Sequence, residues 1–190
     1  MKTRHEGRSP AISGIVKVSI LCVSVIALSG CPSTESLYRQ AYTHYLWEEE
    51  AEALALLDRI LEKDDSYAQA YILESLIFQK RGESDKALVL LEKASQKAPG
   101  SAVVRFNLGN LYFQRRKYED ARTAYRAAIE RDPSLSEAHL NLANTLMVLK
   151  QYPDALKEYE TFLTMAVKEY PEVKRLVELL RVEFGGRTGE

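Results

Sequence analysis

The sequence predicts an all-α fold built from four similar helix pairs and one further helix. Three observations support this prediction. The chain is self-similar at a period of 34 residues, which starts at Thr34 and continues without gaps. Small residues recur at two fixed positions of each period, and an amphipathic segment that begins with a proline follows the last period. Periods of this length are typical of arrays in which each unit is a pair of helices.

The chain before the first period has a different composition. Residues 1–17 carry four Lys or Arg against one acid, and an eleven-residue apolar run follows from Val18 to Leu28. This order is typical of a secretory signal peptide, here assigned to residues 1–30. The run is shorter than the roughly 20 residues that a membrane-spanning helix needs. A retained membrane helix is the alternative interpretation.

The residues that end this segment, Leu28-Ser29-Gly30-Cys31, resemble the lipobox of bacterial lipoproteins. The resemblance implies cleavage before Cys31, a diacylglycerol on its sulfur and often a further acyl chain, such as palmitate, on its amine. Several acyl chains anchor a protein firmly in a membrane. Residues 31–33 are then a short tether. In a bacterium with two membranes, Pro32 after the cysteine, rather than an aspartate, favours the periplasmic face of the outer membrane. The alternative is that Cys31 is an incidental residue of an ordinary signal peptide.

Charge and cysteine content exclude some classes of partner. Removal of residues 1–30 leaves 22 basic and 26 acidic side chains, a formal charge of −4. A nucleic-acid-binding protein needs a basic face to neutralise phosphates, so we expect no nucleic-acid partner. Cys22 leaves with the signal peptide, and a lipidated Cys31 leaves no free thiol.

Four consecutive segments, 34–67, 68–101, 102–135 and 136–169, share a residue pattern. Position eight is small, position twenty is alanine, and position twenty-four is large. In order, these residues are Ala41, Ser75, Gly109 and Ala143; Ala53, Ala87, Ala121 and Ala155; and Leu57, Leu91, Tyr125 and Tyr159. Position thirty-two is proline in the two middle segments, at Pro99 and Pro133.

These residues resemble the tetratricopeptide repeat over nearly all of the chain after residue 33. The resemblance implies a right-handed α-solenoid of four tetratricopeptide helix pairs plus a C-terminal capping helix. Small residues let the two helices of a pair approach closely, and proline ends the second helix. The first and fourth repeats are degenerate. The fourth has Val167 in place of the proline, so we expect its second helix to run on toward Glu169.

The segment after the fourth repeat fits a capping helix over residues 171–184. Proline suits the first turn of a helix. Apolar residues then recur at helical spacing along one face, at Val173, Leu176, Val177, Leu180 and Phe184. Residues 185–190 are expected to form a flexible tail.

The first helices of tetratricopeptide repeats line a concave groove, so the resemblance places a partner-binding site there. The residues assigned to this groove are Tyr38, Tyr42, Tyr45, Ile72, Leu76, Phe106, Asn107, Asn110, Phe113, Leu140, Asn141, Asn144 and Met147. Most are apolar or aromatic, and a large exposed apolar surface usually marks a binding site. It fits an extended peptide or an amphipathic helix. Alternatively, some of these residues pack between first helices or beneath residues 171–184.

Two asparagine pairs, Asn107 with Asn110 and Asn141 with Asn144, lie 34 residues apart. Residues three apart share one face of a helix. The repeat therefore predicts a ladder of amides along the groove. An amide both donates and accepts hydrogen bonds, so a ladder can pair with the backbone of an extended peptide. The alternative is that Asn107 and Asn141 bond to helix carbonyls or water.

The sequence gives little support to a catalytic or metal-binding function. His44 and His139 fall at packing positions, and the acidic run Glu48–Glu50 falls at a turn. The sequence has no glycine-rich phosphate loop and no nucleophile paired with a base. We therefore predict no enzyme activity, no cofactor and no metal.

The layout resembles tetratricopeptide lipoproteins of the bacterial envelope, including pilotins. This implies an anchored scaffold that holds a segment of an envelope protein and assists assembly of a pilus or secretion complex. The alternative is an outer-membrane adaptor, dimeric or otherwise homo-oligomeric, that organises peptidoglycan hydrolases on its convex face.

Overall fold

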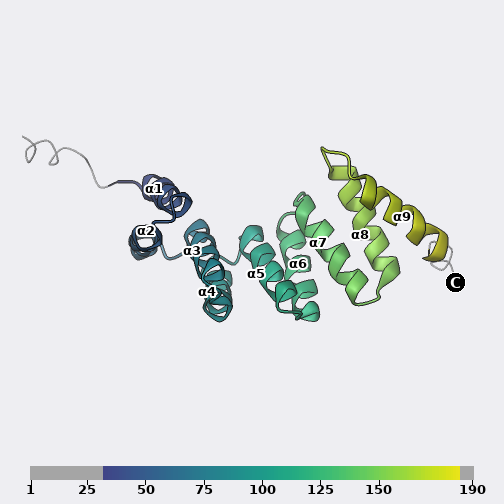
Figure 1. The fold of residues 1–190 in the computed structure, drawn as a ribbon, viewed down its shortest axis with the longest axis horizontal. Helices are drawn as coiled ribbons and strands as arrows, with labels where there is room; N and C mark the ends of the chain where they lie inside the picture. Colours follow the sequence, from purple (N-terminus) through teal and green to yellow (C-terminus); the bar gives the residue numbers. More distant parts are fainter. Residues whose placement is uncertain (1–31, 185–190) are drawn as a thin grey trace, which may run out of the picture. The chain divides into compact units, whose positions relative to one another are not determined.

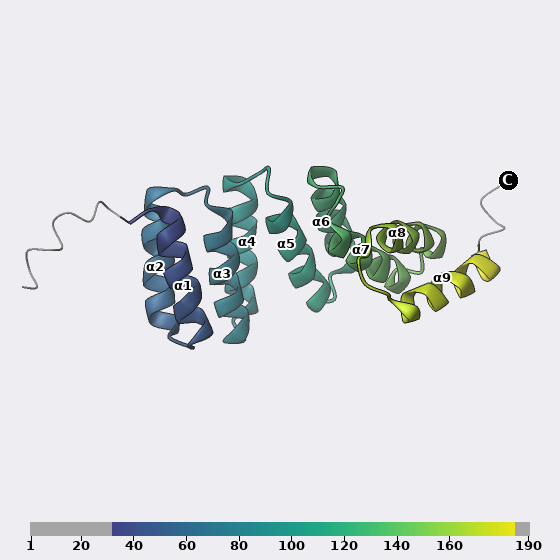
Figure 2. The ribbon, with the colours of Figure 1, turned by 90° about the horizontal axis from the view of Figure 1, so that it is seen from above.

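The computed structural model describes residues 32–184. The signal peptide, the lipid on Cys31 and the tail 185–190 therefore fall outside the described residues and stay predictions. Within the described range nine helices follow one another (Figures 1 and 2). They are α1 (Thr34–Leu46), α2 (Glu50–Lys63), α3 (Ala68–Lys80), α4 (Ser84–Lys97), α5 (Ala102–Gln114), α6 (Tyr118–Arg131), α7 (Ser136–Val148), α8 (Tyr152–Met165) and α9 (Pro171–Phe184).

The first eight helices form four pairs in chain order. The two helices of each pair contact each other, and the second helix of a pair contacts the first helix of the next pair. Each first helix also contacts the first helix of the next pair: α1 contacts α3, α3 contacts α5, and α5 contacts α7. In the described part of the chain, no second helix contacts another second helix. First helices are therefore more closely spaced, and they line the inner side. The predicted α-solenoid of helix pairs with a final helix is confirmed.

Small residues allow the helices of each pair to approach. The alanines at position twenty are all fully buried, and so are Ala41, Ser75 and Ala143 at position eight. Gly109 is the tightest case, because a Cβ atom there would lie 2.6 Å from Cε1 of Tyr125. The tyrosine ring occupies the space that a methyl group fills elsewhere.

The turn inside each pair repeats one backbone feature. Glu48, Gly82, Arg116 and Lys150 all have positive φ, between 59° and 77°. These residues are 34 positions apart, so a residue in the left-handed conformation closes all four turns at the same position of the repeat. Only the second turn places glycine there, the residue that adopts this conformation without a steric cost.

The end of the fourth pair differs from the prediction. Helix α8 ends at Met165 and does not continue toward Glu169. Ala166 takes an extended conformation while its N–H still donates to the Phe162 carbonyl over 2.9 Å. Pro171 disfavours a helical residue before it, which separates α8 from α9. Helix α9 then buries Val173, Val177 and Leu180 in the core cluster that also holds residues of α8.

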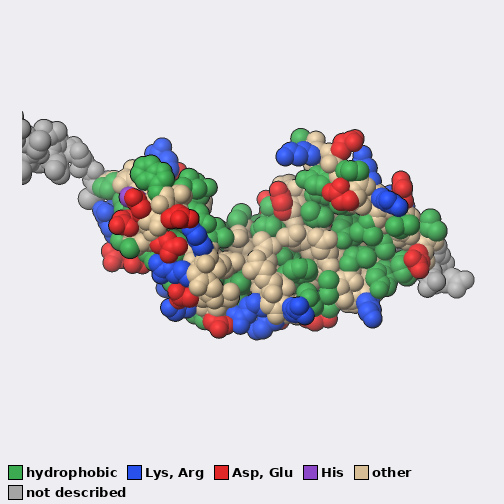
Figure 3. All heavy atoms as spheres, viewed as in Figure 1, with side chains coloured by type: hydrophobic (Ala, Val, Ile, Leu, Met, Phe, Trp, Pro, Cys, Tyr) green, Lys and Arg blue, Asp and Glu red, His purple; other side chains and the backbone are tan. Residues whose placement is uncertain are grey.

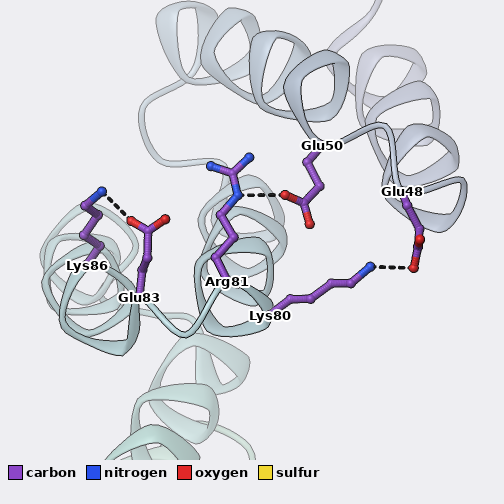
Figure 4. Close-up of polar contacts among 6 residues, drawn as sticks. All are labelled: Glu48, Glu50, Lys80, Arg81, Glu83 and Lys86. Atoms are coloured by element: carbon purple, nitrogen blue, oxygen red, sulfur yellow. Dashed lines mark hydrogen bonds and ion pairs between the residues drawn. The ribbon is translucent and has the colours of Figure 1, made fainter.

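Ion pairs join the turns of the first two pairs (Figure 4). Lys80 Nζ lies 2.8 Å from Glu48 Oε1, and Arg81 Nε lies 2.7 Å from Glu50 Oε2. Glu49 pairs with His44 over 2.6 Å. The acidic run is therefore at a turn, as expected, and each of its carboxylates has a basic partner. None of the helices in residues 32–184 is long and apolar enough to cross a membrane.

Candidate functional site

All thirteen residues assigned to the groove lie on the first helices α1, α3, α5 and α7, and none of them is buried. In the space-filling view the surface is hollowed over α3 and α5 (Figure 3). The structure gathers these residues into separate groups. At one end Tyr38 stacks on Tyr42 with ring centroids 6.4 Å apart, and Tyr42 lies 6.2 Å from Tyr45. Ile72 and Leu76 follow on α3.

A pocket between α5, α6 and α7 brings the polar residues together. It has a volume of about 280 Å³. We call it the amide pocket, and its lining residues are Asn110, Phe113, Gln114, Tyr125, Asn141 and Asn144. Four of these six were assigned to the groove from the sequence; Gln114 and Tyr125 were not.

Hydrogen bonds orient the amides of the pocket. Asn110 Oδ1 accepts from the Tyr125 hydroxyl over 2.8 Å and from Asn141 Nδ2 over 2.8 Å. Asn144 Oδ1 accepts from the Tyr159 hydroxyl over 2.6 Å. With their oxygens engaged, Asn110 and Asn144 keep Nδ2 as a donor without a partner in residues 32–184, while Asn141 keeps Oδ1 as an acceptor.

The two tyrosines act as fixed donors behind the amides. Both rings are buried, and burial raises the pKa of Tyr125 and of Tyr159 above the ordinary value of a phenol. Their hydroxyls therefore stay protonated at neutral pH. The sequence does contain this signal: Asn and Tyr stand 15 residues apart in both the third and fourth repeats. In the first two repeats the same position twenty-four holds Leu57 and Leu91, which cannot donate.

Asn107 and Asn141 occupy equivalent positions but make different bonds. Asn141 reaches back to Asn110 in the preceding repeat, whereas Asn107 Nδ2 donates to the Val103 carbonyl of its own helix over 2.8 Å. The residue that corresponds to Asn110 in the second repeat is Leu76, which offers no acceptor. Asn107 therefore lies outside the amide pocket, and the ladder has three amides.

The apolar residues beside the pocket are partly packed. The Phe106 ring centroid lies 6.0 Å from that of Tyr125, and Leu140 and Met147 pack against the C-terminal core cluster. Phe113 contacts the ring of Tyr118 edge to face at 5.4 Å and also lines the pocket. These side chains surround the amides with apolar surface.

The pocket suits recognition of a neutral polar chain. Its six side chains are three asparagines, a glutamine, a phenylalanine and a tyrosine, and none is charged at neutral pH. Such groups donate and accept hydrogen bonds. A peptide group carries one donor and one acceptor, and so it matches the free amide N–H and carbonyl groups here.

Comparison with known proteins places this geometry in a known type of fold. Residues 106–172, which span the amide pocket, match the family model described as Tetratricopeptide repeat. No curated protein matches the sequence.

Several solved structures are similar. PilF of Pseudomonas aeruginosa has a TM-score of 0.67 at 21% identity, over 80% of this chain and 69% of that chain. MamA has a TM-score of 0.66 at 16% identity, over 81% of this chain and 84% of that chain. YrrB is described as a TPR protein with an unusual peptide-binding site. It has a TM-score of 0.64 at 18% identity, over 83% of this chain and 80% of that chain. The fold is therefore that of tetratricopeptide-repeat proteins.

Proposed function

We propose that this chain is a lipid-anchored scaffold of the bacterial cell envelope that binds an extended segment of a partner protein in the amide pocket. The observation that carries the proposal is the set of oriented amides. Asn110 and Asn144 are held by tyrosine hydroxyls with their N–H groups free, and Asn141 supplies an acceptor between them. This arrangement recognises backbone rather than a particular side chain.

Apolar contacts would supply much of the affinity. A hydrogen bond contributes only about 0.5–1.5 kcal/mol net, so two or three of them hold a peptide weakly. Phe113 lines the pocket itself, and the exposed Leu76 of α3 continues the surface along the first helices. An extended segment with apolar residues among its backbone contacts fits this surface best.

Two kinds of comparison support the proposal. Among the similar folds, YrrB has a described peptide-binding site, and the first TPR of Spaghetti (RPAP3) is bound to an HSP90 peptide. The resemblance to pilotin lipoproteins, read from the sequence, favours a component of a pilus or secretion complex as the partner. Cys31 would provide the anchor through its acyl chains.

Site-specific photocrosslinking in native envelopes tests this function. A photoreactive residue replaces Gln114, which lines the pocket, and in a matched strain it replaces Gln96, an exposed residue of α4 on a second helix. The proposal predicts that Gln114 crosslinks to one defined segment of an envelope protein and that Gln96 does not. Phe113→Ala with Asn144→Ala should abolish the crosslink, whereas Asn107→Ala should leave it intact.

Other results would contradict the proposal. A crosslink that persists in the Phe113→Ala, Asn144→Ala variant would remove the pocket from the account. A crosslink to a peptidoglycan hydrolase from Gln96 alone would support the adaptor function on the convex face instead.

A further inference from the structure

The first helix has an uncovered face with large apolar side chains at one end. No helix precedes α1 in residues 32–184. Tyr42, Leu46 and Trp47 are 45%, 59% and 68% exposed. Leu46 stands four positions after Tyr42 and so shares its face of α1, and Trp47 follows directly after the last residue of the helix. Hydrophobic side chains gather over α1 in Figure 3. Trp47 is the only tryptophan of the chain.

The acidic residues beside this patch do not leave it strongly negative. Glu48, Glu49 and Glu50 follow Trp47 directly and alone would repel anionic lipid headgroups. Each of them has a partner instead. Glu48 pairs with Lys80 at 2.8 Å and Glu50 with Arg81 at 2.7 Å (Figure 4). Glu49 lies 2.6 Å from His44. The lysine and the arginine offset two of the three carboxylates, so the run adds one net negative charge to this edge rather than three.

In the sequence, α1 follows closely after the predicted anchor. Two residues, Pro32 and Ser33, separate Cys31 from the start of α1, and they span at most about 10 Å together with the flanking bonds. The thirteen residues of α1 extend about 20 Å. Along the exposed face, Glu35 and Arg39 cancel in charge before Tyr42 and Leu46 follow at helical spacing. A helix lying along a membrane would place both the tether and the patch at its surface.

We infer that Tyr42, Leu46 and Trp47 insert into the headgroup region of the membrane that holds the anchor. Tryptophan and tyrosine favour this region because each has an apolar ring and a polar group. The contact would lay α1 along the membrane and set the orientation of the scaffold, which a single point of attachment would not do. The inference rests on the proposed lipid anchor at Cys31.

Fluorescence of Trp47 tests the contact directly, since no other tryptophan contributes. The full lipidated chain is reconstituted into phosphatidylethanolamine and phosphatidylglycerol vesicles, with and without brominated acyl chains. We expect a blue shift of the emission, a several-fold fall in quenching by aqueous iodide, and loss of emission with brominated lipid. Tyr42→Ser with Leu46→Ser, which keeps Trp47, should reverse these changes while the protein still floats with the vesicles.

A matched control moves the reporter to the other end of the array. In Trp47→Phe with Val182→Trp the tryptophan replaces a valine of α9 that is 90% exposed. Its emission should stay that of a water-exposed ring and should not be lost with brominated lipid.

The two proposals fail in different ways. If the wild-type chain floats with vesicles but Trp47 remains open to iodide and insensitive to brominated lipid, the membrane contact is wrong and the anchor stands. If the chain does not float, the anchor and the contact both fall. A shift of Trp47 emission on adding an envelope protein, but not lipid, would make this patch a protein-binding surface and overturn the inference.

Discussion

At the scale of single residues, the amide pocket depends on the tyrosines that hold its asparagines. The Tyr159 hydroxyl donates to Asn144 Oδ1 over 2.6 Å. We expect Tyr159→Phe to cost about 1 kcal/mol of stability, the usual value of one hydrogen bond, and to weaken peptide binding because the Asn144 amide is free to rotate. Denaturant unfolding and peptide titration measure the two effects.

Tyr152→Phe is the matched control for this change. The Tyr152 ring stacks on Phe184 with centroids 4.7 Å apart, and its hydroxyl makes no hydrogen bond within residues 32–184. Stability and binding should stay close to wild type. Equal effects of the two substitutions would show that the hydroxyl of Tyr159 does not orient Asn144.

Gly109 is required by its contact with Tyr125. A methyl group there would meet Cε1 of the ring at 2.6 Å, so the ring that bonds Asn110 has to move. Alanine normally favours a helix over glycine, yet we expect Gly109→Ala to destabilise the fold by about 1–3 kcal/mol through overpacking. At Gly100 an added Cβ meets nothing within 4 Å, so Gly100→Ala should be neutral. Thermal unfolding compares the two variants, and equal midpoints would contradict this account.

Glu74 of α3 makes stability depend on pH. Burial, and then the nearby Asp58 carboxylate, raise the pKa of Glu74 from 4.5 to about 7. The unfolded chain loses this proton first as pH rises, so stability falls between about pH 4.5 and 7 and the loss is complete above pH 7. Because the side chain is partly exposed, we expect Glu74→Gln to gain on the order of 1–2 kcal/mol at pH 8.

The pH profile separates this cause from a simple packing effect. Chemical unfolding at pH 4.5 and pH 8 should show the gain from Glu74→Gln only at the higher pH. An equal gain at both values would mean that ionisation of Glu74 does not destabilise the fold.

At the scale of elements, α9 stabilises the array by covering α8. Val177 is 3% exposed and lies in the C-terminal core cluster, whereas Val182 on the same helix is 90% exposed. Val177→Asp would bury an unpaired charge, so we expect it to cost more than about 3 kcal/mol. Val182→Asp should change stability by less than about 0.5 kcal/mol. Circular dichroism during denaturant unfolding measures both, and a small effect at Val177 would show that α9 is not needed as a cap.

The fold could be predicted from the sequence because the residues that pack the helices together recur with the 34-residue repeat. Small residues at positions eight and twenty recur every 34 residues, and the helix pairs they predicted are confirmed. The end of α8 was predicted wrongly, since the pattern at Val167 gave no stop signal. The extended Ala166 and the restriction before Pro171 ended the helix earlier.

The site was harder to predict because its bonds cross between repeats. Equivalent positions made Asn107 and Asn141 look alike, but only Asn141 has an asparagine in the preceding repeat as its acceptor. The repeat pattern shows Tyr125 only as the large residue of position twenty-four, whereas in the structure its hydroxyl orients Asn110. A period in the sequence shows which positions correspond, whereas hydrogen bonds depend on which residue occupies each neighbouring position.

At the scale of the whole helical unit, the core is divided along the array. One cluster joins α1, α2 and α3, another joins α6 to α9, and two smaller clusters lie between them. In such arrays each pair is stabilised mainly by its neighbours. The exposed patch of α1 adjoins the first cluster, and the amide pocket adjoins the last. The proposed membrane contact and the proposed peptide site are therefore carried by different parts of the core.

The measurement that tests the central claim most directly is the affinity of the crosslinked partner segment, as a synthetic peptide, for three purified proteins. These are wild type, Phe113→Ala with Asn144→Ala, and Asn107→Ala. Loss of one amide bond and one apolar contact predicts an affinity at least about tenfold lower for the double variant, and no change for Asn107→Ala. Equal affinity for all three proteins would contradict the claim that the amide pocket binds the partner.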